Sequence, residues 1–162
     1  MSFNIVLSSP SGAGKTTITK KLSQKYPNIK VSISHTTRKP RSNEIDGVDY
    51  HFVNQEEFKR LIKKDNFYEY AKIFDNYYGT SKDSVIKLHK KDYDVVFDID
   101  WQGTKQLSQF KELNLIKIFI LPPDKQELKK RLINRNQDNN QTIEKRLKQY
   151  EKDIQHWFDY DY

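Results

Sequence analysis

The segment SPSGAGKT, residues 9–16, constrains the fold of this 162-residue chain more than any other feature. It follows an apolar stretch, Phe3 to Ser8, and precedes residues such as Ile18 and Leu22 that are apolar at helical spacing. The segment matches the phosphate-binding loop pattern GxxxxGK[ST], with Ser9 in place of the first glycine. In such a loop the amides of a tight turn and of a helix N-terminus converge on phosphate oxygens. Strand, loop and helix in this order predict a nucleotide-binding α/β sheet.

The polar positions of this loop and of a second motif predict a magnesium site. Lys15 supplies a positive charge to the outer phosphates of a nucleotide, and Thr16 supplies a hydroxyl to Mg²⁺. The motif FDIDWQG places Asp98 and Asp100 at the end of another apolar stretch, on the same side because strand side chains alternate. A carboxylate at a strand end beside the loop can hold the water shell of Mg²⁺. We therefore predict that Thr16 binds the metal, and that Asp98 does so through water.

Four apolar runs predict the strands of one open parallel sheet. They extend over Phe3 to Ser8, Ile29 to Ser34, Tyr93 to Asp98 and Leu115 to Leu121. These runs are mostly apolar on both faces, as expected where helices cover both sides of a parallel sheet. Helical patterns lie between them, and this alternation predicts right-handed crossovers. We expect an α/β fold with an open parallel sheet and helices on both faces.

Two regions interrupt this alternation. Residues 34–91 contain a polar, turn-rich stretch, short strand-like pieces (YHFV and FYEYAKIF) and a helix-like segment (EEFKRLIKK). We expect them to form a small insertion beside the C-terminal edge of the sheet, where open α/β sheets bind ligands. From Asp124 to about His156 the chain is predicted to be helical, with a polar interruption from Asn134 to Gln141.

Composition and charge exclude several classes of function. The net charge is +7, but its 23 lysines are spread along the chain rather than gathered in a patch, so we expect no nucleic-acid partner. Without cysteine there is no disulfide, thiolate zinc site or cysteine nucleophile, and the four histidines show no ligand spacing with acids. No apolar run approaches the length of a membrane span, and the N-terminus does not resemble a signal peptide. A cytoplasmic protein without a membrane partner is expected.

Further motifs follow in order along the chain. They are HTTRKPRSNEIDGVDYHFV from His35 to Val53, EYAKIFDNYYGTS from Glu69 to Ser81, DIDWQG, and LPPDKQELKKRL followed by Arg135 and EKRL. With the phosphate-binding loop (P-loop) they cover essentially the whole chain, which resembles the guanylate kinase family, a group of P-loop nucleoside monophosphate kinases. The resemblance implies a single domain, 1–162, of the P-loop NTPase type with a mixed α+β GMP-binding insertion and a helical lid. Its implied parts are a core of residues 1–33, 92–124 and 147–162, an insertion of residues 34–91 and a lid of about residues 125–146.

The resemblance also implies two nucleotide sites. Residues that match those binding the GMP phosphate are Arg38, Arg41, Tyr50 and Tyr78, and residues that match those around guanine are Ser34, Glu69, Thr80 and Asp100. Carboxylates suit the N1–H and NH₂ donors of guanine, whereas adenine would leave them unpaired. The implied ATP-binding residues are Ser9, Pro10, Ser11, Gly12, Ala13, Gly14, Lys15, Thr16 and Thr17. The implied catalytic residues are Lys15, Arg38, Arg41, Arg131, Arg135 and Arg146.

The distribution of arginine agrees with these assignments. The chain has only six arginines, and all except Arg60 fall at motif positions. One arginine can donate two parallel hydrogen bonds to a pair of phosphate oxygens, which lysine does less well. Taken singly, Arg131, Arg135 and Arg146 are equally compatible with exposed helix positions. Taken together, they predict a lid that brings arginines onto the ATP phosphates.

The activity implied by the resemblance is transfer of the γ-phosphoryl group of ATP to GMP or dGMP with Mg²⁺, giving ADP and GDP or dGDP, in purine nucleotide metabolism. Three alternatives stay open at this point: another kinase on the same scaffold, such as a ribose bisphosphate kinase; a non-catalytic guanylate-kinase-like module; and a nucleic-acid binder suggested by the charge. In the family a further strand and helix follow, completing the sheet and helping to seat adenine, whereas this sequence ends at Tyr162.

Overall fold

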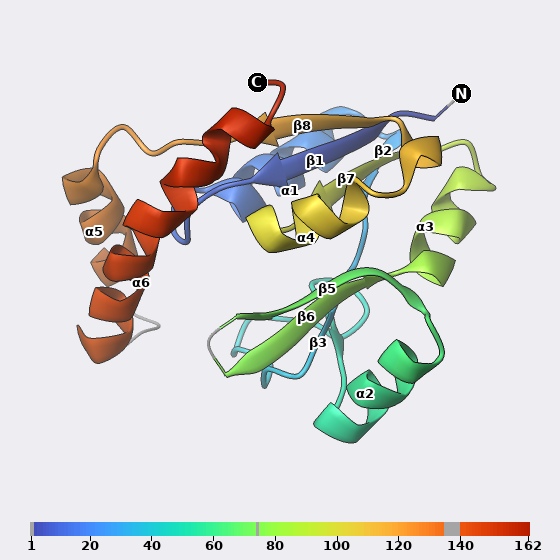
Figure 1. The fold of residues 1–162 in the computed structure, drawn as a ribbon, viewed down its shortest axis with the longest axis horizontal. Helices are drawn as coiled ribbons and strands as arrows, with labels where there is room; N and C mark the ends of the chain where they lie inside the picture. The colour runs from blue at the N-terminus through green and yellow to red at the C-terminus, as the bar shows by residue number, and fades with distance from the viewer. Residues whose placement is uncertain (1, 74, 135–139) are drawn as a thin grey trace.

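The computed structural model describes residues 2–73, 75–134 and 140–162. Two four-stranded sheets lie next to each other, and a pair of helices lies beside the first of them (Figure 1). Among the described residues, every helix is too short or too polar to cross a membrane.

The first sheet is parallel throughout, with strand order β2-β7-β1-β8. Its strands are β1 (Asn4–Ser8), β2 (Ile29–Val31), β7 (Asp94–Asp98) and β8 (Leu115–Phe119). All four predicted strands are present, and the predicted α/β class is confirmed. Strand β2 is three residues shorter than predicted, because the chain leaves this sheet after the bond from Ser32 N to Val96 O and enters the second one.

Helices cover both faces of this sheet, as predicted. Figure 1 shows α1 (Lys15–Lys25) behind the sheet and α4 (Trp101–Leu107) in front of it. Helix α1 packs on β1, β2 and β7, whereas α4 packs on β1. The short helix η1 (Lys111–Leu113) leads into β8. Fully buried Val6, Val95, Phe97 and Leu107 form the core between these elements.

The second sheet is mixed, with order β4-β3-β6-β5. It consists of β3 (His35–Thr36), β4 (His51–Phe52), β5 (Phe67–Ile73) and β6 (Asn76–Ser81), with helices α2 (Gln55–Lys63) and α3 (Lys82–His89). Helix α2 begins where the Asn54 side chain accepts a bond from Glu57 N, and its Phe58 stacks on Phe67 and Tyr77. The strand-like and helix-like pieces YHFV, FYEYAKIF and EEFKRLIKK correspond to β4, β5 and α2.

The chain after β8 is helical, as predicted, but the predicted interruption is wrong at both ends. Helix α5 (Lys125–Asn134) includes Asn134, and helix α6 (Asn140–Asp153) already includes Gln141. Residues 135–139 of that stretch lie outside the described residues. The two helices pack through Leu128, Leu132 and Ile143. A 3₁₀ helix, η2 (Ile154–Asp159), follows, and Phe119 N then donates to Tyr162 O at the edge of β8.

Candidate functional site

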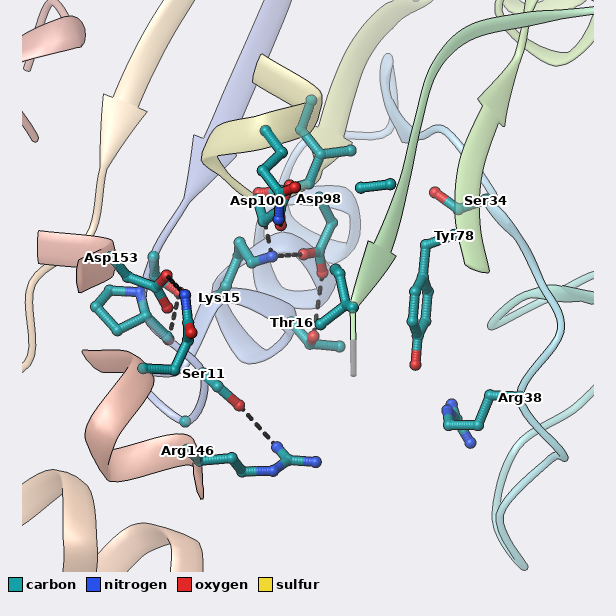
Figure 2. Close-up of a pocket in the computed structure, with 18 of the residues that line it drawn as sticks. Ser11, Lys15, Thr16, Ser34, Arg38, Tyr78, Asp98, Asp100, Arg146 and Asp153 are labelled. Carbon is teal, nitrogen blue, oxygen red and sulfur yellow. Dashed lines mark hydrogen bonds and ion pairs between the residues drawn. The ribbon is translucent and has the colours of Figure 1, made fainter. Parts of the chain in front are cut away.

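A cavity of about 320 Å³ lies between the carboxyl ends of β1 and β7 and the second sheet. Helix α4 connects these two walls, because it packs against both β1 and β5. Figure 2 shows Ser11, Arg146 and Asp153 on one side of the cavity and Ser34, Arg38 and Tyr78 on the other. Lys15, Thr16, Asp98 and Asp100 lie between these two groups.

The loop between β1 and α1 needs glycine at two positions. Gly12 and Gly14 have φ of +95° and +107°, and a Cβ on Gly12 would lie 2.9 Å from Leu132 Cδ2. Ser9, which replaces the first glycine of the pattern, is not in the left-handed region, so the substitution causes no backbone strain there. Its hydroxyl donates to Pro10 O at 3.0 Å. The loop therefore accommodates serine where the pattern has glycine.

Lys15, Thr16 and Asp98 form one hydrogen-bonded cluster at the end of this loop. The Lys15 Nζ atom is 2.7 Å from Asp98 Oδ1 and donates to Ile99 O at 3.2 Å. Thr16 Oγ1 donates to Asp98 Oδ2 at 3.0 Å. Burial opposes the charge of Lys15, but the attraction of Asp98 outweighs it and the pKa of Lys15 lies above its ordinary value. Lys15 is therefore positively charged at neutral pH.

Two arginines from the pair α5 and α6 contact the loop. Arg146 Nη1 donates to Ser11 Oγ at 2.7 Å, and Arg131 Nη1 donates to Ala13 O at 3.2 Å. Both contacts join residues more than a hundred positions apart in the sequence. The α5–α6 pair thus places two predicted arginines beside the loop, and Arg135 lies outside the described residues.

The second sheet contributes a cluster of arginine and tyrosine. The Arg38 guanidinium lies 5.4 Å from the centre of the Tyr50 ring, which packs edge-on against Tyr78. Glu44 holds the arginines in place: its Oε1 accepts from Arg38 Nη2 at 2.7 Å, and its Oε2 accepts from Arg41 N at 2.8 Å. Glu44 was not predicted as a site residue, although it lies three positions after Arg41.

A polar group on the same side of the cavity consists of buried Ser34, Glu69 and Thr80 together with half-buried Asp100. Glu69 is 4% exposed and lies opposite Thr80 in the β5–β6 pair, directly after a bulge. Thr80 Oγ1 is 3.4 Å from Ser34 Oγ. Burial raises the pKa of Glu69 to about 7, even though hydrogen bonding with Thr80 acts to lower it. Asp100 caps α4, where its Oδ1 accepts from Gly103 N at 2.9 Å.

Most predicted site residues that the structure describes line this one cavity. They are Ser9, Pro10, Ser11, Gly12, Gly14, Lys15, Thr16, Ser34, Arg38, Arg41, Tyr50, Glu69, Tyr78, Asp98, Asp100 and Arg146. Four others lie beside it without lining it: Ala13, Thr17, Thr80 and Arg131.

Sequence reasoning missed Gln102, Gln149 and Asp153, which also line the cavity. Asp153 Oδ1 accepts from Gln149 Nε2 at 2.9 Å and from Trp101 Nε1 at 3.2 Å. Burial raises the pKa of Asp153. The four-residue spacing of Gln149 and Asp153 on one helix was the available signal.

The chain was compared with protein families and with known proteins. The guanylate kinase family model matches residues 1–162. The guanylate kinase of Rickettsia prowazekii is 49% identical over 158 residues, which are 98% of this chain and 80% of that protein. That of Paramagnetospirillum magneticum is 47% identical over 158 residues, 98% of this chain and 74% of that protein.

A solved structure agrees with this assignment. The crystal structure of guanylate kinase from Anaplasma phagocytophilum superposes with a TM-score of 0.76 at 33% identity, over 99% of this chain and 74% of that one. The match therefore extends over nearly the whole of this chain and does not rest on one short motif. This chain belongs to the guanylate kinase family.

Proposed function

We propose that the protein transfers the γ-phosphoryl group of ATP to GMP or dGMP, giving ADP and GDP or dGDP. One observation carries this proposal: the Lys15 cluster lies between two cationic groups that project from opposite walls of one cavity (Figure 2). A cavity with a phosphate-binding loop on one wall and arginine on the other fits two phosphorylated substrates that meet end to end.

We assign each wall of the cavity to one of the two substrates. We assign the ATP phosphates to residues 9–17, with Arg131 and Arg146 from the helix pair, and the GMP phosphate to Arg38, Arg41, Tyr50 and Tyr78. Guanine would bind against the polar group of Ser34, Glu69, Thr80 and Asp100. The carboxylates of that group accept from the N1–H and NH₂ donors of guanine, and the hydroxyls can donate or accept.

The residues act by positioning and by neutralising charge. An oxygen of the GMP phosphate attacks the γ-phosphorus, and the bond from that phosphorus to the β–γ bridging oxygen breaks. The attacking oxygen is already ionised near neutral pH, so no general base is required. Lys15 and the arginines spread positive charge over the transferred group, and closure of the two walls would exclude water as a competing acceptor.

Thr16 and Asp98 fit a magnesium ion bound together with ATP. Their hydroxyl and carboxylate oxygens are 3.0 Å apart beside the loop, and Mg²⁺ in phosphate sites takes one or two protein oxygens and completes its shell with water and phosphate. Among the described residues no three acidic or histidine side chains form a dedicated metal site. Mg²⁺ would neutralise charge on the β- and γ-phosphates, with Thr16 as a ligand and Asp98 acting through water.

We further propose that the parts of the chain divide as the motifs indicate: a core of residues 1–33, 92–124 and 147–162, a GMP-binding insertion of residues 34–91 and a lid of about residues 125–146. The second sheet and α2 support the insertion, because all of their residues fall within it. Both substrates are metabolites of the cytoplasm, and we propose that the enzyme works there.

A coupled ADP-release assay tests the proposed activity. The 162-residue chain would be supplied with ATP, Mg²⁺ and one of GMP, AMP, CMP or UMP. Turnover is expected with GMP, and the rate with AMP is expected to be at least about 10³-fold lower because adenine leaves the carboxylates of Glu69 and Asp100 unpaired. Equal rates with GMP and AMP would refute the assignment of the guanine site.

The raised pKa of Glu69 predicts a pH dependence of GMP binding. Below about pH 7 the carboxyl becomes protonated, and a protonated carboxyl presents a donor to the donors of guanine. The KM for GMP is therefore expected to rise about tenfold between pH 8 and pH 6. Because the GMP phosphate also titrates near pH 6, the comparison is with Glu69→Gln, whose profile contains only the phosphate contribution. Parallel profiles for the two proteins would contradict the prediction.

A further inference from the structure

Helix α4 contains a glycine that its helical structure does not require. Gly103 is the third residue of α4 and is buried. Glycine is one of the least favourable residues in a helix, because it loses the most backbone freedom on folding. Neither a positive φ nor a turn explains its presence, since Gly103 has helical backbone geometry. The explanation has to come from what surrounds it.

The space that a side chain would take at Gly103 is filled by Glu69. A Cβ atom built on Gly103 would lie 2.6 Å from Glu69 Oε2 and 3.1 Å from Glu69 Cδ. The next contact, Ile99 Cβ at 3.3 Å, is much less severe. Glu69 is 4% exposed in β5 and lines the cavity, so the end of its side chain would have to shift toward the cavity. Even one methyl group at position 103 would therefore displace this carboxylate.

The backbone of the same residue holds the other acidic side chain of the group. Gly103 N donates to Asp100 Oδ1 at 2.9 Å, and Gln102 Nε2 donates to Asp100 Oδ2 at 3.2 Å. Asp100 is thereby fixed at the start of α4. The absent side chain of Gly103 and its N–H group thus act on two different carboxylates that line one cavity.

We propose that Gly103 is a positioning residue for guanine recognition. Because Gly103 has no side chain, the Glu69 carboxylate has space to face the base, and the Gly103 N–H fixes the Asp100 carboxylate beside it. This inference rests on the proposed function, because it assigns Glu69 and Asp100 to guanine. It adds a residue that touches neither substrate and acts through the two that do.

The variant Gly103→Ala tests this role. Alanine keeps the N–H bond to Asp100 and favours the helix, so the main change is the methyl group against Glu69. The KM for GMP is expected to rise at least about tenfold, with kcat and the KM for ATP within about threefold of the wild type. Lys105→Ala, an exposed position of the same helix, is the matched control and should change none of these values. An unchanged KM for GMP, or an equal rise for both substrates, would overturn the proposal.

A double variant separates displacement of Glu69 from a general structural effect. In a Glu69→Ala background the carboxylate is gone, so Gly103→Ala should cause no further loss of kcat/KM for GMP. Losses that multiply would overturn the proposal. If Gly103→Ala alone fails to fold, the double variant should fold, because the carboxylate that meets the methyl group is gone. A double variant that also fails to fold would overturn the proposal. The wild-type protein is measured in parallel. The proposed function fails only if the wild type itself does not phosphorylate GMP, so its failure can be told apart from failure of the Gly103 proposal.

Discussion

Replacing Lys15 with alanine is expected to lower kcat for GMP phosphorylation by about 10³-fold or more. The side chain lies 2.7 Å from Asp98 Oδ1, between the two groups of residues that we assign to the phosphates of ATP and of GMP. Its removal takes away the positive charge closest to that group and leaves Asp98 without its cationic partner. The transition state then loses stabilisation and also meets an uncompensated carboxylate.

This prediction is checked by steady-state kinetics together with calorimetry of GMP binding. GMP affinity should stay within a few-fold of the wild type, because Lys15 is not among the residues that we assign to GMP. Lys21→Ala, an exposed lysine of the same helix α1, provides the matched control and should keep full activity. If kcat of the Lys15→Ala protein stayed within tenfold of the wild type, the proposed role of the P-loop in phosphoryl transfer would be refuted.

Replacing Glu69 with alanine is the second change with a large expected effect. The value of kcat/KM for GMP should fall about 10²- to 10³-fold, because guanine loses a charged acceptor in a buried site. The KM for ATP should be nearly unchanged. The measurement is kcat/KM for each substrate, and a loss shared equally between GMP and ATP would instead indicate a general disturbance of the fold.

The conservative variant Glu69→Gln is expected to make the unliganded protein more stable. In the native state burial holds the Glu69 pKa near 7, whereas the unfolded chain has a value near 4.5. The unfolded state therefore releases its proton first, and the ionised carboxyl destabilises the fold as the pH rises from 4.5 through 7. Thermal unfolding should show Glu69→Gln melting above the wild type at pH 8, and the gap should close toward pH 5. A lower melting temperature at pH 8 would contradict the raised pKa.

The sequence predicted the parts of the fold that repeat a strong local pattern. Apolar runs predicted β1, β7 and β8 to within two residues at each end, because the strands of a parallel sheet covered by helices are mostly apolar. Strand β6 was missed because NYYGTS is polar and contains glycine, and its pairing with β5 and β3 is what makes it a strand. The β5–β6 hairpin and the pairing with the more distant β3 define this strand without leaving an apolar pattern within it.

The same distinction applies to the site. Lys15 and Asp98 each belong to a motif, and the structure places them together. Glu44 lies inside a quoted motif and Asp153 at helical spacing from Gln149, but neither position by itself indicates that the carboxylate holds other side chains in place. Such supporting contacts depend on how the two walls meet, and they become visible only when the folded chain is seen.

The position of β1 within its sheet has a consequence for the order of events on the ribosome. Strand β1 is made first, but its partners β7 and β8 begin at residues 94 and 115, so it has nothing to pair with until most of the chain has emerged. The second sheet, with strands between residues 35 and 81, contains all of its own partners and can form earlier. Arg146 can reach Ser11 only later still. A nascent chain would thus form the second sheet, with the residues that we assign to the GMP phosphate, before its P-loop is held in the first sheet.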